Sequence, residues 1–191
     1  MSVPAIVLAA GRSSRFGRNK LVQPVRGRPM IHWVLDALAD PRLSPIIVVV
    51  GFEKEVVAEC CAQLAGPVTI VENELYEQGR SSSIRAGITA LPPGSSCALV
   101  ALGDMPFITA SLVTALLDAF HRKPLITFPI VAGRKGHPVI FPAHTFPLLQ
   151  QLRGDKTLHD YLLNHPDLTQ PIPWDDSGCT VDIDTSDDHP G

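Results

Sequence analysis

AIVLAAGRSSRFGRNK, residues 5–20, begins as a short apolar run and ends as a loop rich in cations. The continuous apolar run from Ala5 to Leu8 is typical of a strand buried on both faces of a sheet. Small residues follow at Ala9, Ala10 and Gly11, and three arginines and a lysine lie among residues 12–20. Small residues let backbone N–H groups approach a ligand, while the cations supply positive charge. The stretch therefore predicts an anion site for a phosphate chain; the alternative is an ordinary turn with a solvated basic surface.

Two familiar phosphate-binding loops do not fit this stretch. A Walker loop needs Gly-Lys followed by Ser or Thr, whereas Lys20 follows Asn19 and precedes Leu21. The dinucleotide fingerprint G-x-G-x-x-G is absent as well, because Ser13 and Ser14 stand where its glycine pattern should continue. The predicted anion site is therefore of another kind.

Composition excludes several classes of protein. The chain has 191 residues, 45% of them hydrophobic and 18% charged, which suits one soluble globular domain. Its net charge of −3 argues against a nucleic-acid surface. No apolar run is long enough for a secretory signal or a membrane span, so we expect a cytoplasmic protein. The cysteines lack metal-binding spacing and are expected to be small buried hydrophobes: Cys60, Cys61, Cys97 and Cys179.

The rest of the chain alternates strand-like and helix-like segments. Apolar runs predict buried strands at 46–50, 68–71 and 98–102, and helical spacing predicts helices around 31–38, 57–64, 84–91 and 113–120. Thr109 is a candidate N-cap for the last of these helices. Such a rhythm favours a mostly parallel sheet with helices on both faces. Further on, strands at 125–130 and 139–141 are joined by a short turn at 133–136, which predicts an antiparallel hairpin.

In a parallel sheet, ligands bind beyond the carboxyl ends of the strands. The rule selects the loop after Ala9, Gly51, the residues from Glu72 and those from Gly103 as one crevice. Within the last of these stretches, Asp104 stands in Leu-Gly-Asp-Met-Pro and could be a helix cap or a magnesium ligand. We expect a single domain over residues 1–191, with a nucleotide-binding part at about 1–107 and an acceptor-binding part at about 108–191.

Three further segments contain candidate site residues. Val-Asp-Ile-Asp-Thr at 181–185 alternates like a strand and would place Asp182 and Asp184 on one face; the alternative is an exposed acidic terminus. Ser83 follows Gly79 and could cap a helix while freeing N–H groups for a ligand. His137, in Gly-His-Pro-Val, could equally be a structural histidine.

Several of these motifs resemble those of the MobA-like nucleotidyltransferases. The family signature LAAGxSxRMGxxK is matched at every fixed position except one, since Phe16 replaces its Met: Leu8, Ala9, Ala10, Gly11, Ser13, Arg15, Gly17 and Lys20. LGDMP, the Gly79 to Ser83 segment and the DIDT tail resemble further family motifs, although Ser186 replaces a usual Pro. The GHPV motif and Arg153-Gly154-Asp155 resemble the cytidylyltransferase branch, although Lys156 and the residues after it depart from its pattern.

The resemblance implies a Rossmann-like three-layer α/β/α fold and assigns roles to residues. Arg15 and Lys20 would act on phosphates, and Asp104 would hold Mg²⁺ (or Mn²⁺) with Asp182 or Asp184. His137 and Asp155 would face the acceptor. The nucleotide would contact a larger set: Leu8, Ala9, Ala10, Gly11, Ser13, Arg15, Lys20, Gly79, Ser83 and Gly103.

The implied reaction transfers CMP from CTP to the phosphate of molybdopterin, the molybdenum cofactor, and releases pyrophosphate. Two features favour CTP over GTP as the substrate. The first is Ala10, because the guanylyl branch has glycine there, in the sequence LAGG. The second is the GHPV motif. The alternatives are a guanylyl- or sugar-phosphate nucleotidyltransferase of the same fold, or a non-catalytic cofactor-binding maturation factor for a molybdenum hydroxylase. We expect a monomer that could meet a molybdenum hydroxylase apoenzyme and binds neither nucleic acid nor membrane.

Overall fold

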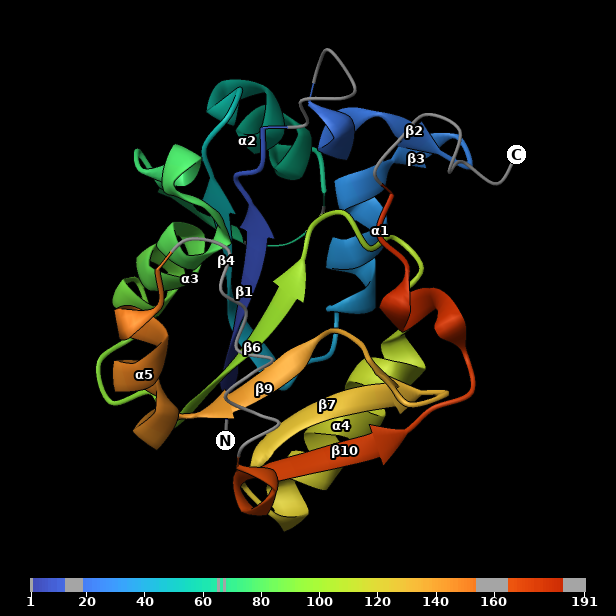
Figure 1. Cartoon of the computed structure of the whole chain (residues 1–191). Coiled ribbons are helices and arrows are strands. Elements are labelled where there is room, and N and C mark those ends of the chain that lie inside the picture. Colours follow the sequence, from blue (N-terminus) through green and yellow to red (C-terminus); the bar gives the residue numbers. More distant parts are fainter. Residues whose placement is uncertain (1, 13–18, 65, 67, 154–164, 184–191) are drawn as a thin grey trace.

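The computed structural model describes residues 2–12, 19–64, 66, 68–153 and 165–183. Strands of one mixed sheet are β1 (Val3–Ala9), β4 (Leu43–Val50), β5 (Val68–Glu72), β6 (Cys97–Leu102), β7 (Ile126–Val131), β8 (Arg134–Lys135), β9 (Val139–Pro142) and β10 (Thr169–Pro173). Their order is β10-β7-β9-β6-β1-β4-β5, with β8 beside β7 (Figure 1). Strand β9 runs antiparallel to β6 and β7, while β1, β4, β5 and β6 are mutually parallel. The predicted mixed, mostly parallel sheet is confirmed.

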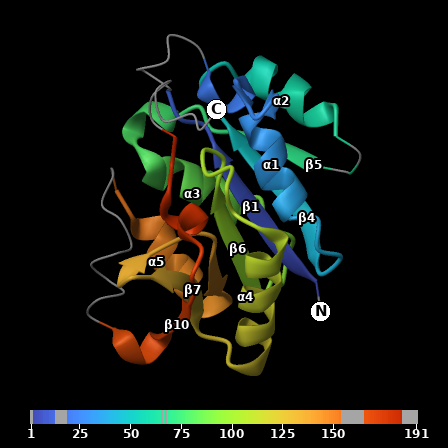
Figure 2. The ribbon, with the colours of Figure 1, turned by 90° about the vertical axis from the view of Figure 1, so that its right-hand side faces the viewer.

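Helices cover both faces of this sheet. They are α1 (Met30–Ala37), α2 (Lys54–Ala62), α3 (Arg80–Thr89), α4 (Ala110–Arg122) and α5 (Phe146–Gln151). Buried residues of α1, α2 and α4 join one apolar cluster, and those of α3 and α5 join a second cluster on the opposite face. Figures 1 and 2 show α3 and α5 on one side of β1 and β6, with α1 and α4 on the other. The three-layer α/β/α expectation is confirmed.

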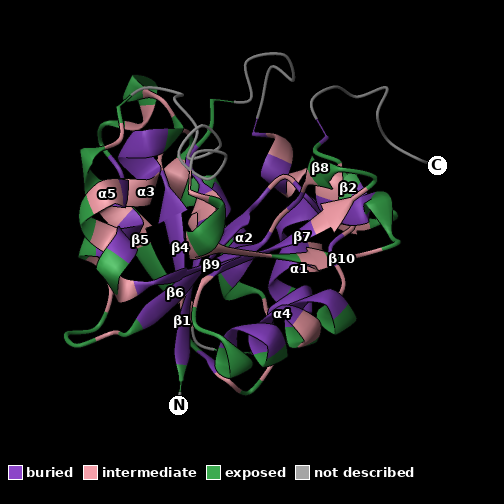
Figure 3. Ribbon diagram, turned by 60° about the horizontal axis from the view of Figure 1, so that its bottom comes forward, coloured by how far each residue is buried: buried purple, intermediate pink, exposed green. Residues whose placement is uncertain are grey.

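Strand β1 lies inside the sheet and contributes side chains to both apolar clusters. Ala5, Val7 and Ala9 point into the α1 side, whereas Ile6 points into the α3 side, as the period of two requires. Burial on both faces is why the run is continuously apolar, and Figure 3 shows the central strands buried beneath exposed helix surfaces. On the α3 side, a Cβ at Gly87 would lie 2.5 Å from Ile6 Cγ2, so the glycine lets the helix pack close.

Parallel pairing brings four strand ends to one edge of the sheet. Leu8 pairs with Leu102, Ala9 with Val50, and Val50 in turn with Glu72. Since β9 is antiparallel to β6, its beginning lies at the same edge. The crevice predicted from the sequence is therefore assembled as expected, and the segment before Val139 joins it from the second half of the chain.

Some elements differ from expectation. A small hairpin, β2 (Pro24–Val25) with β3 (Arg28–Pro29), precedes α1. β8, β10 and α5 were not expected, and short 3₁₀ turns occur at η1 (Lys20–Val22), η2 (Tyr76–Gln78), η3 (Ala143–Thr145), η4 (Pro166–Leu168) and η5 (Ser177–Thr180). The strand expected at 181–185 is wrong for residues 181–183, which follow η5 without joining a sheet.

Two smaller expectations can be checked. Thr109 caps α4 as predicted, because its hydroxyl accepts the N–H of Leu112 at 3.3 Å. All four cysteines are buried and unpaired, which fits small core residues. Among the described residues, no helix combines the length and the apolar character needed to cross a membrane.

Candidate active site

A hollow of about 320 Å³ lies at the common edge of the strands, on the α3 side. Strand β1 and the residues after it contribute small side chains, and β6 contributes its carboxyl end. A third wall comes from η2 and the start of α3. The lining residues are Leu8, Ala10, Gly11, Arg12, Tyr76, Glu77, Gly79, Arg80, Ser83, Leu102 and Asp104.

Small residues leave parts of the backbone accessible from this hollow. A Cβ on Gly11 would meet no atom within 4 Å, so the space in front of its backbone is open. Gly51 is different, because a Cβ there would lie 2.7 Å from Tyr76 Cβ and 2.9 Å from Ala10 Cβ. Gly51 thereby lets Tyr76 pack down beside Ala10 and form a wall of the hollow. At the rim, Arg12 and Glu77 form an exposed ion pair of 2.7 Å.

Lys20 and Asp104 meet at the carboxyl end of β6. Lys20 Nζ lies 2.9 Å from Asp104 Oδ2, and the two side chains are only 12% and 19% exposed. The same ammonium donates to the carbonyl oxygen of Ile183 at 2.9 Å, and the Ile183 N–H donates to the Asp104 carbonyl oxygen at 3.1 Å. The side chain of Lys20, Asp104 and the backbone of Ile183 are thus linked to one another, although they lie far apart in the sequence. The predicted partnership of the opening stretch with Asp104 has a direct geometric basis.

Asn19 fixes the position of Lys20. It is completely buried, its Nδ2 donates to the Phe52 carbonyl oxygen at 2.8 Å, and its Oδ1 accepts the N–H of Leu21 at 3.1 Å. Its own N–H donates to the Glu53 carboxylate at 2.8 Å. Sequence reasoning missed Asn19 and Glu53. The available signal was an Asn directly before a Lys-Leu-Val turn, a residue type that caps such turns.

The start of α3 is built differently from the prediction. Gly79, with φ of 91°, is the N-cap residue, and Ser83 lies inside the helix, so the expected capping role of Ser83 is wrong. Instead, Asn73 at the end of β5 donates through Nδ2 to the Ser82 and Ser83 hydroxyls, at 2.8 and 3.0 Å. Asn73, also missed, ties the helix start to the sheet edge. The positive end of α3 consequently faces the hollow.

Two other residues that were predicted to contact nucleotide, Ala9 and Gly103, are buried and do not line the hollow. Ala9 is buried in β1 and is not part of the lining. The Gly103 N–H donates to the Leu8 carbonyl oxygen at 2.9 Å, and a Cβ on Gly103 would lie 3.0 Å from that oxygen. Gly103 thus permits the close approach of β6 to β1, and its contact with nucleotide stays a prediction. Ser13, Arg15, Asp155 and Asp184 lie outside the described residues.

The oxygen donors at this edge fit a hard divalent cation. Asp104 is half-buried, and Asp182 is exposed one residue before Ile183, which is hydrogen-bonded to Asp104. Within the described residues there is no group of three or more His, Cys, Asp and Glu that could hold a metal. Magnesium, however, commonly uses one or two carboxylates, waters and substrate phosphate oxygens. A single carboxylate such as Asp104 is therefore enough protein ligand for such a metal, and metal binding by Asp182 stays a prediction.

His137 lies two residues before β9, on the second-half side of the crevice. Its Nδ1 is buried and has no hydrogen-bond partner among the described residues, while its backbone N–H donates to the Cys179 carbonyl oxygen at 2.8 Å. Burial, followed by the charges of Lys135 and Arg80, lowers the pKa of His137 to about 3. The side chain is therefore a neutral imidazole at physiological pH.

This shift predicts a specific loss of stability in acid. The unfolded chain protonates His137 near its ordinary pKa of 6.5, whereas the folded chain does so only near 3, so the unfolded state binds more protons between these values. The stability present above pH 6.5 should therefore fall progressively as the pH is lowered toward 3. Urea unfolding between pH 7 and 5 should show a shallower acid dependence for His137→Asn than for the wild type. His144→Asn, at an exposed position, is the control; equal slopes for all three proteins would contradict the assignment.

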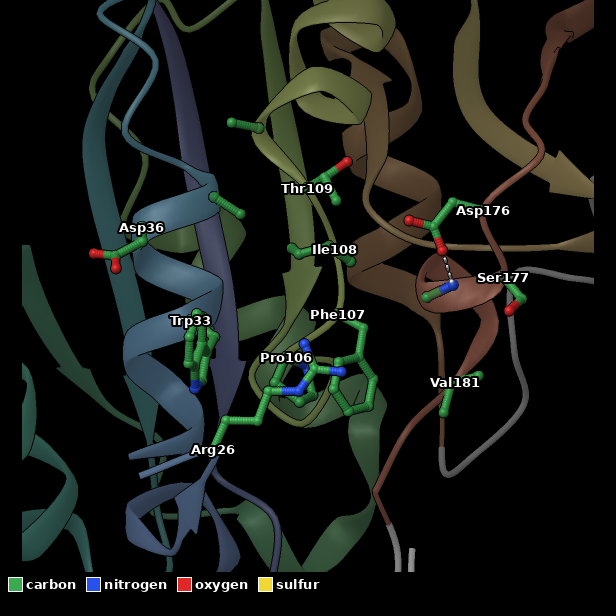
Figure 4. Close-up of a pocket in the computed structure, with 13 residues that line it drawn as sticks. Arg26, Trp33, Asp36, Pro106, Phe107, Ile108, Thr109, Asp176, Ser177 and Val181 are labelled. Atoms are coloured by element: carbon green, nitrogen blue, oxygen red, sulfur yellow. Dashed lines mark hydrogen bonds between the residues drawn. The ribbon is translucent and has the colours of Figure 1, made fainter. Parts of the chain in front are cut away.

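A larger hollow, of about 950 Å³, lies on the other side of the loop that follows β6. Figure 4 shows Trp33 of α1 on one wall and Asp176, Ser177 and Val181 on the other, with Arg26 extended toward Phe107 between them. The Arg26 guanidinium carbon lies 5.4 Å from the centre of the Phe107 ring. This hollow has a mostly apolar and aromatic lining. Its lining includes neither the opening loop nor Asp104, so several residues that were predicted to contact nucleotide lie at the smaller hollow instead.

The sequence of this chain is similar to a known protein family and to curated proteins. Residues 5–168 match the MobA-like NTP transferase domain. The bifunctional protein GlmU of Pelobacter propionicus is 33% identical over 139 residues, which are 72% of this chain and only 30% of GlmU. The matched part of this chain therefore spans 30% of the length of that GlmU protein.

Solved structures share the fold over nearly the whole chain. Rv0371c from Mycobacterium tuberculosis H37Rv superposes with a TM-score of 0.84 at 26% identity, covering 98% of this chain and 95% of that one. A second structure of that protein is a complex with manganese, with a TM-score of 0.79 at 24% identity over 98% and 96% of the two chains. A CMP:2-keto-3-deoxy-manno-octonic acid synthetase complexed with CTP gives 0.71 at 15% identity, over 96% and 94%. Because the family match covers most of the chain and includes both halves of the crevice, the chain belongs to the MobA-like NTP transferase domain family.

Proposed function

We propose that this protein is a nucleotidyltransferase that transfers CMP from CTP to the phosphate of molybdopterin. The observation that carries the proposal is the Lys20–Asp104 pair beside a hollow whose lining includes the small residues Ala10, Gly11 and Gly79. A triphosphate needs positive charge, accessible N–H groups and a metal-binding carboxylate together, and these groups meet at one sheet edge. Arg15, which belongs to the same loop in the sequence, is proposed as a second phosphate contact.

The chemistry requires little from the protein beyond position and charge. An oxygen of the acceptor phosphate forms a bond to the α-phosphorus of CTP, the bond from that phosphorus to the bridging oxygen breaks, and pyrophosphate leaves with the electron pair. A phosphate monoester is largely dianionic at neutral pH, since its second pKa is near 6, so no general base is needed. Lys20 would stabilise charge on the phosphates, and the start of α3 would orient the nucleotide.

A divalent metal would be held by Asp104 together with Asp182 or Asp184. When bound, it would neutralise charge on the triphosphate and help to align it. The manganese complex of the mycobacterial structure supports a divalent cation in this family. Whether the metal is Mg²⁺ or Mn²⁺ is open to direct comparison in the assay below.

Cytidine is proposed on the basis of Ala10. Ala10 lines the hollow and is only 3% exposed, and Tyr76 is another lining residue. The guanylyl branch of the family that this chain resembles has glycine at the corresponding position, whereas this chain has alanine, as the cytidylyl branch does. A methyl group there takes space that a purine would need, which favours a pyrimidine.

A pyrophosphate-release assay tests the proposal. Each of the four ribonucleoside triphosphates is offered with Mg²⁺ or Mn²⁺ and with an acceptor: molybdopterin, molybdenum-loaded molybdopterin or a sugar 1-phosphate. We expect release with CTP and a molybdopterin acceptor above all other pairs. Turnover with a sugar phosphate instead would favour the sugar-phosphate alternative. Binding of molybdopterin without turnover under any condition would favour a maturation factor for a molybdenum hydroxylase.

A further inference from the structure

An ion pair at the rim of the nucleotide hollow joins two of its walls. Arg12 Nη2 lies 2.7 Å from Glu77 Oε1, and both residues line the hollow. Arg12 belongs to the segment that follows β1, whereas Glu77 belongs to η2. The two side chains are 61% and 56% exposed, so the pair lies at the opening of the hollow. A ligand that fills the hollow therefore lies next to both charges.

The two partners differ in how firmly they are held. Glu77 stands in a short 3₁₀ turn, and its neighbour Tyr76 packs so closely on Gly51 that a Cβ there would lie 2.7 Å from Tyr76 Cβ. Arg12 reaches Glu77 through a long side chain, and it follows Gly11, in front of which the space is open. Arg12 is therefore the partner that can turn to another anion while Glu77 keeps its place.

The exposure of this pair makes such an exchange easy. Exposed ion pairs contribute little to stability, because water and dissolved ions screen the two charges. A triphosphate carries several negative charges, and its oxygens can accept two parallel hydrogen bonds from one guanidinium group. The phosphate chain is thus a stronger partner for Arg12 than the single carboxylate of Glu77. The Lys20–Asp104 pair differs, since its side chains are mostly buried.

We propose that Arg12 binds the phosphate chain of the nucleotide, and that Glu77 holds Arg12 until a nucleotide displaces it. The inference deepens the proposed function and rests on it for the class of ligand, a nucleoside triphosphate. In the exchange, Arg12 leaves the Glu77 carboxylate to water and donates its N–H groups to phosphate oxygens. Because the pair competes with the nucleotide for Arg12, Glu77 lowers the apparent affinity of the site.

Calorimetric titration with α,β-methylene-CTP and Mg²⁺ tests this exchange without turnover. Arg12→Gln should weaken binding about five- to tenfold, because a charge-assisted contact is lost. Glu77→Gln should tighten binding about two- to fivefold, because the competitor of the phosphates is removed. In a protein that already carries Arg12→Gln, the Glu77→Gln change should alter the affinity less than about 1.5-fold, because no arginine is left to release.

Asp36→Asn is the matched control for Glu77→Gln. It removes one carboxylate from another exposed ion pair, with Arg28 at 2.8 Å, and neither residue lines the nucleotide hollow. This variant should bind the analogue as the wild type does. Thermal midpoints of all these variants should stay within about 2–4 °C of the wild type, so that a change in affinity does not reflect unfolding.

Three results would overturn the proposal. They are unchanged affinity in Arg12→Gln, no binding of the analogue by the wild type, and equal tightening by Glu77→Gln with and without Arg12. The last result would mean that Glu77 only repels the anion. Arg12-dependent binding of the analogue without any transfer of CMP would instead refute the proposed reaction and leave the exchange standing.

Discussion

Replacement of Asp104 by alanine is expected to lower kcat/KM for nucleotidyl transfer by about 10³-fold or more, while the protein remains folded. The carboxylate is the proposed anchor of the divalent cation, and it is also the counter-ion that holds Lys20 at 2.9 Å. Its removal would therefore disturb two charges that act on the same phosphates. Initial rates of pyrophosphate release at several CTP and metal concentrations measure the loss.

The matched control for this variant is Asp118→Ala. Asp118 is also paired with a cation, Arg42, but it lies on the exposed surface of α4. Exposed ion pairs contribute about 0–1 kcal/mol, so this variant should keep wild-type rates. Retention of more than about a tenth of the activity by Asp104→Ala would contradict the assignment of Asp104 as a metal ligand. Loss of a ligand to a catalytic cation is expected to reduce activity much more than tenfold.

Asn19→Ala is expected to lower both stability and activity. The buried amide makes two hydrogen bonds through its side chain, to Phe52 and from Leu21. Loss of both leaves a buried carbonyl and a buried N–H without their partners, a cost of about 2–4 kcal/mol in the free energy of unfolding. Because Lys20 is the next residue, its ammonium loses its fixed position, and kcat/KM should fall about 10–100-fold for each folded molecule. Urea unfolding and rates corrected for the folded fraction measure the two effects.

Glu53→Gln provides a matched comparison for Asn19→Ala. The glutamine carbonyl can still accept the Asn19 N–H that Glu53 accepts at 2.8 Å. We therefore expect a smaller effect on both measurements. If Asn19→Ala were destabilised yet fully active per folded molecule, Asn19 would only support the fold and would not position Lys20.

The sequence predicted the centre of the fold because its signals there are local and strong. The apolar run of β1, the strand at 97–102 and Thr109 as a cap follow directly from burial on two faces and from hydroxyl capping. The crevice followed from them, since parallel strands end at a common edge. The meeting of Lys20 with Asp104 is a consequence of that topology.

The elements that were missed have weak or misleading signals. β10 contains Pro171 and Pro173, which argue against a strand, yet β10 is the edge strand of the sheet and pairs only with β7, where prolines are tolerated. β2 and β3 are two residues each, too short for any periodicity. Ser83 looked like a cap because serine often is one. Its hydroxyl instead accepts a hydrogen bond from Asn73, ten residues earlier and directly after β5, a partner that no capping pattern reveals.

The ion pair and hydrogen bonds that link Lys20, Asp104 and Ile183 have a consequence for folding during synthesis. Lys20 donates to a carbonyl oxygen 163 positions further along the chain, so the contact closes over nearly the full described length. Domains fold progressively during translation, and contacts between distant residues form late. A nascent chain can thus assemble the sheet edge around β1, β4 and β6 while the ribosome is still adding the residues up to Ile183. The hydrogen bond from Lys20 to this carbonyl oxygen forms only after Ile183 has emerged, so the final position of the Lys20 ammonium is reached late in folding.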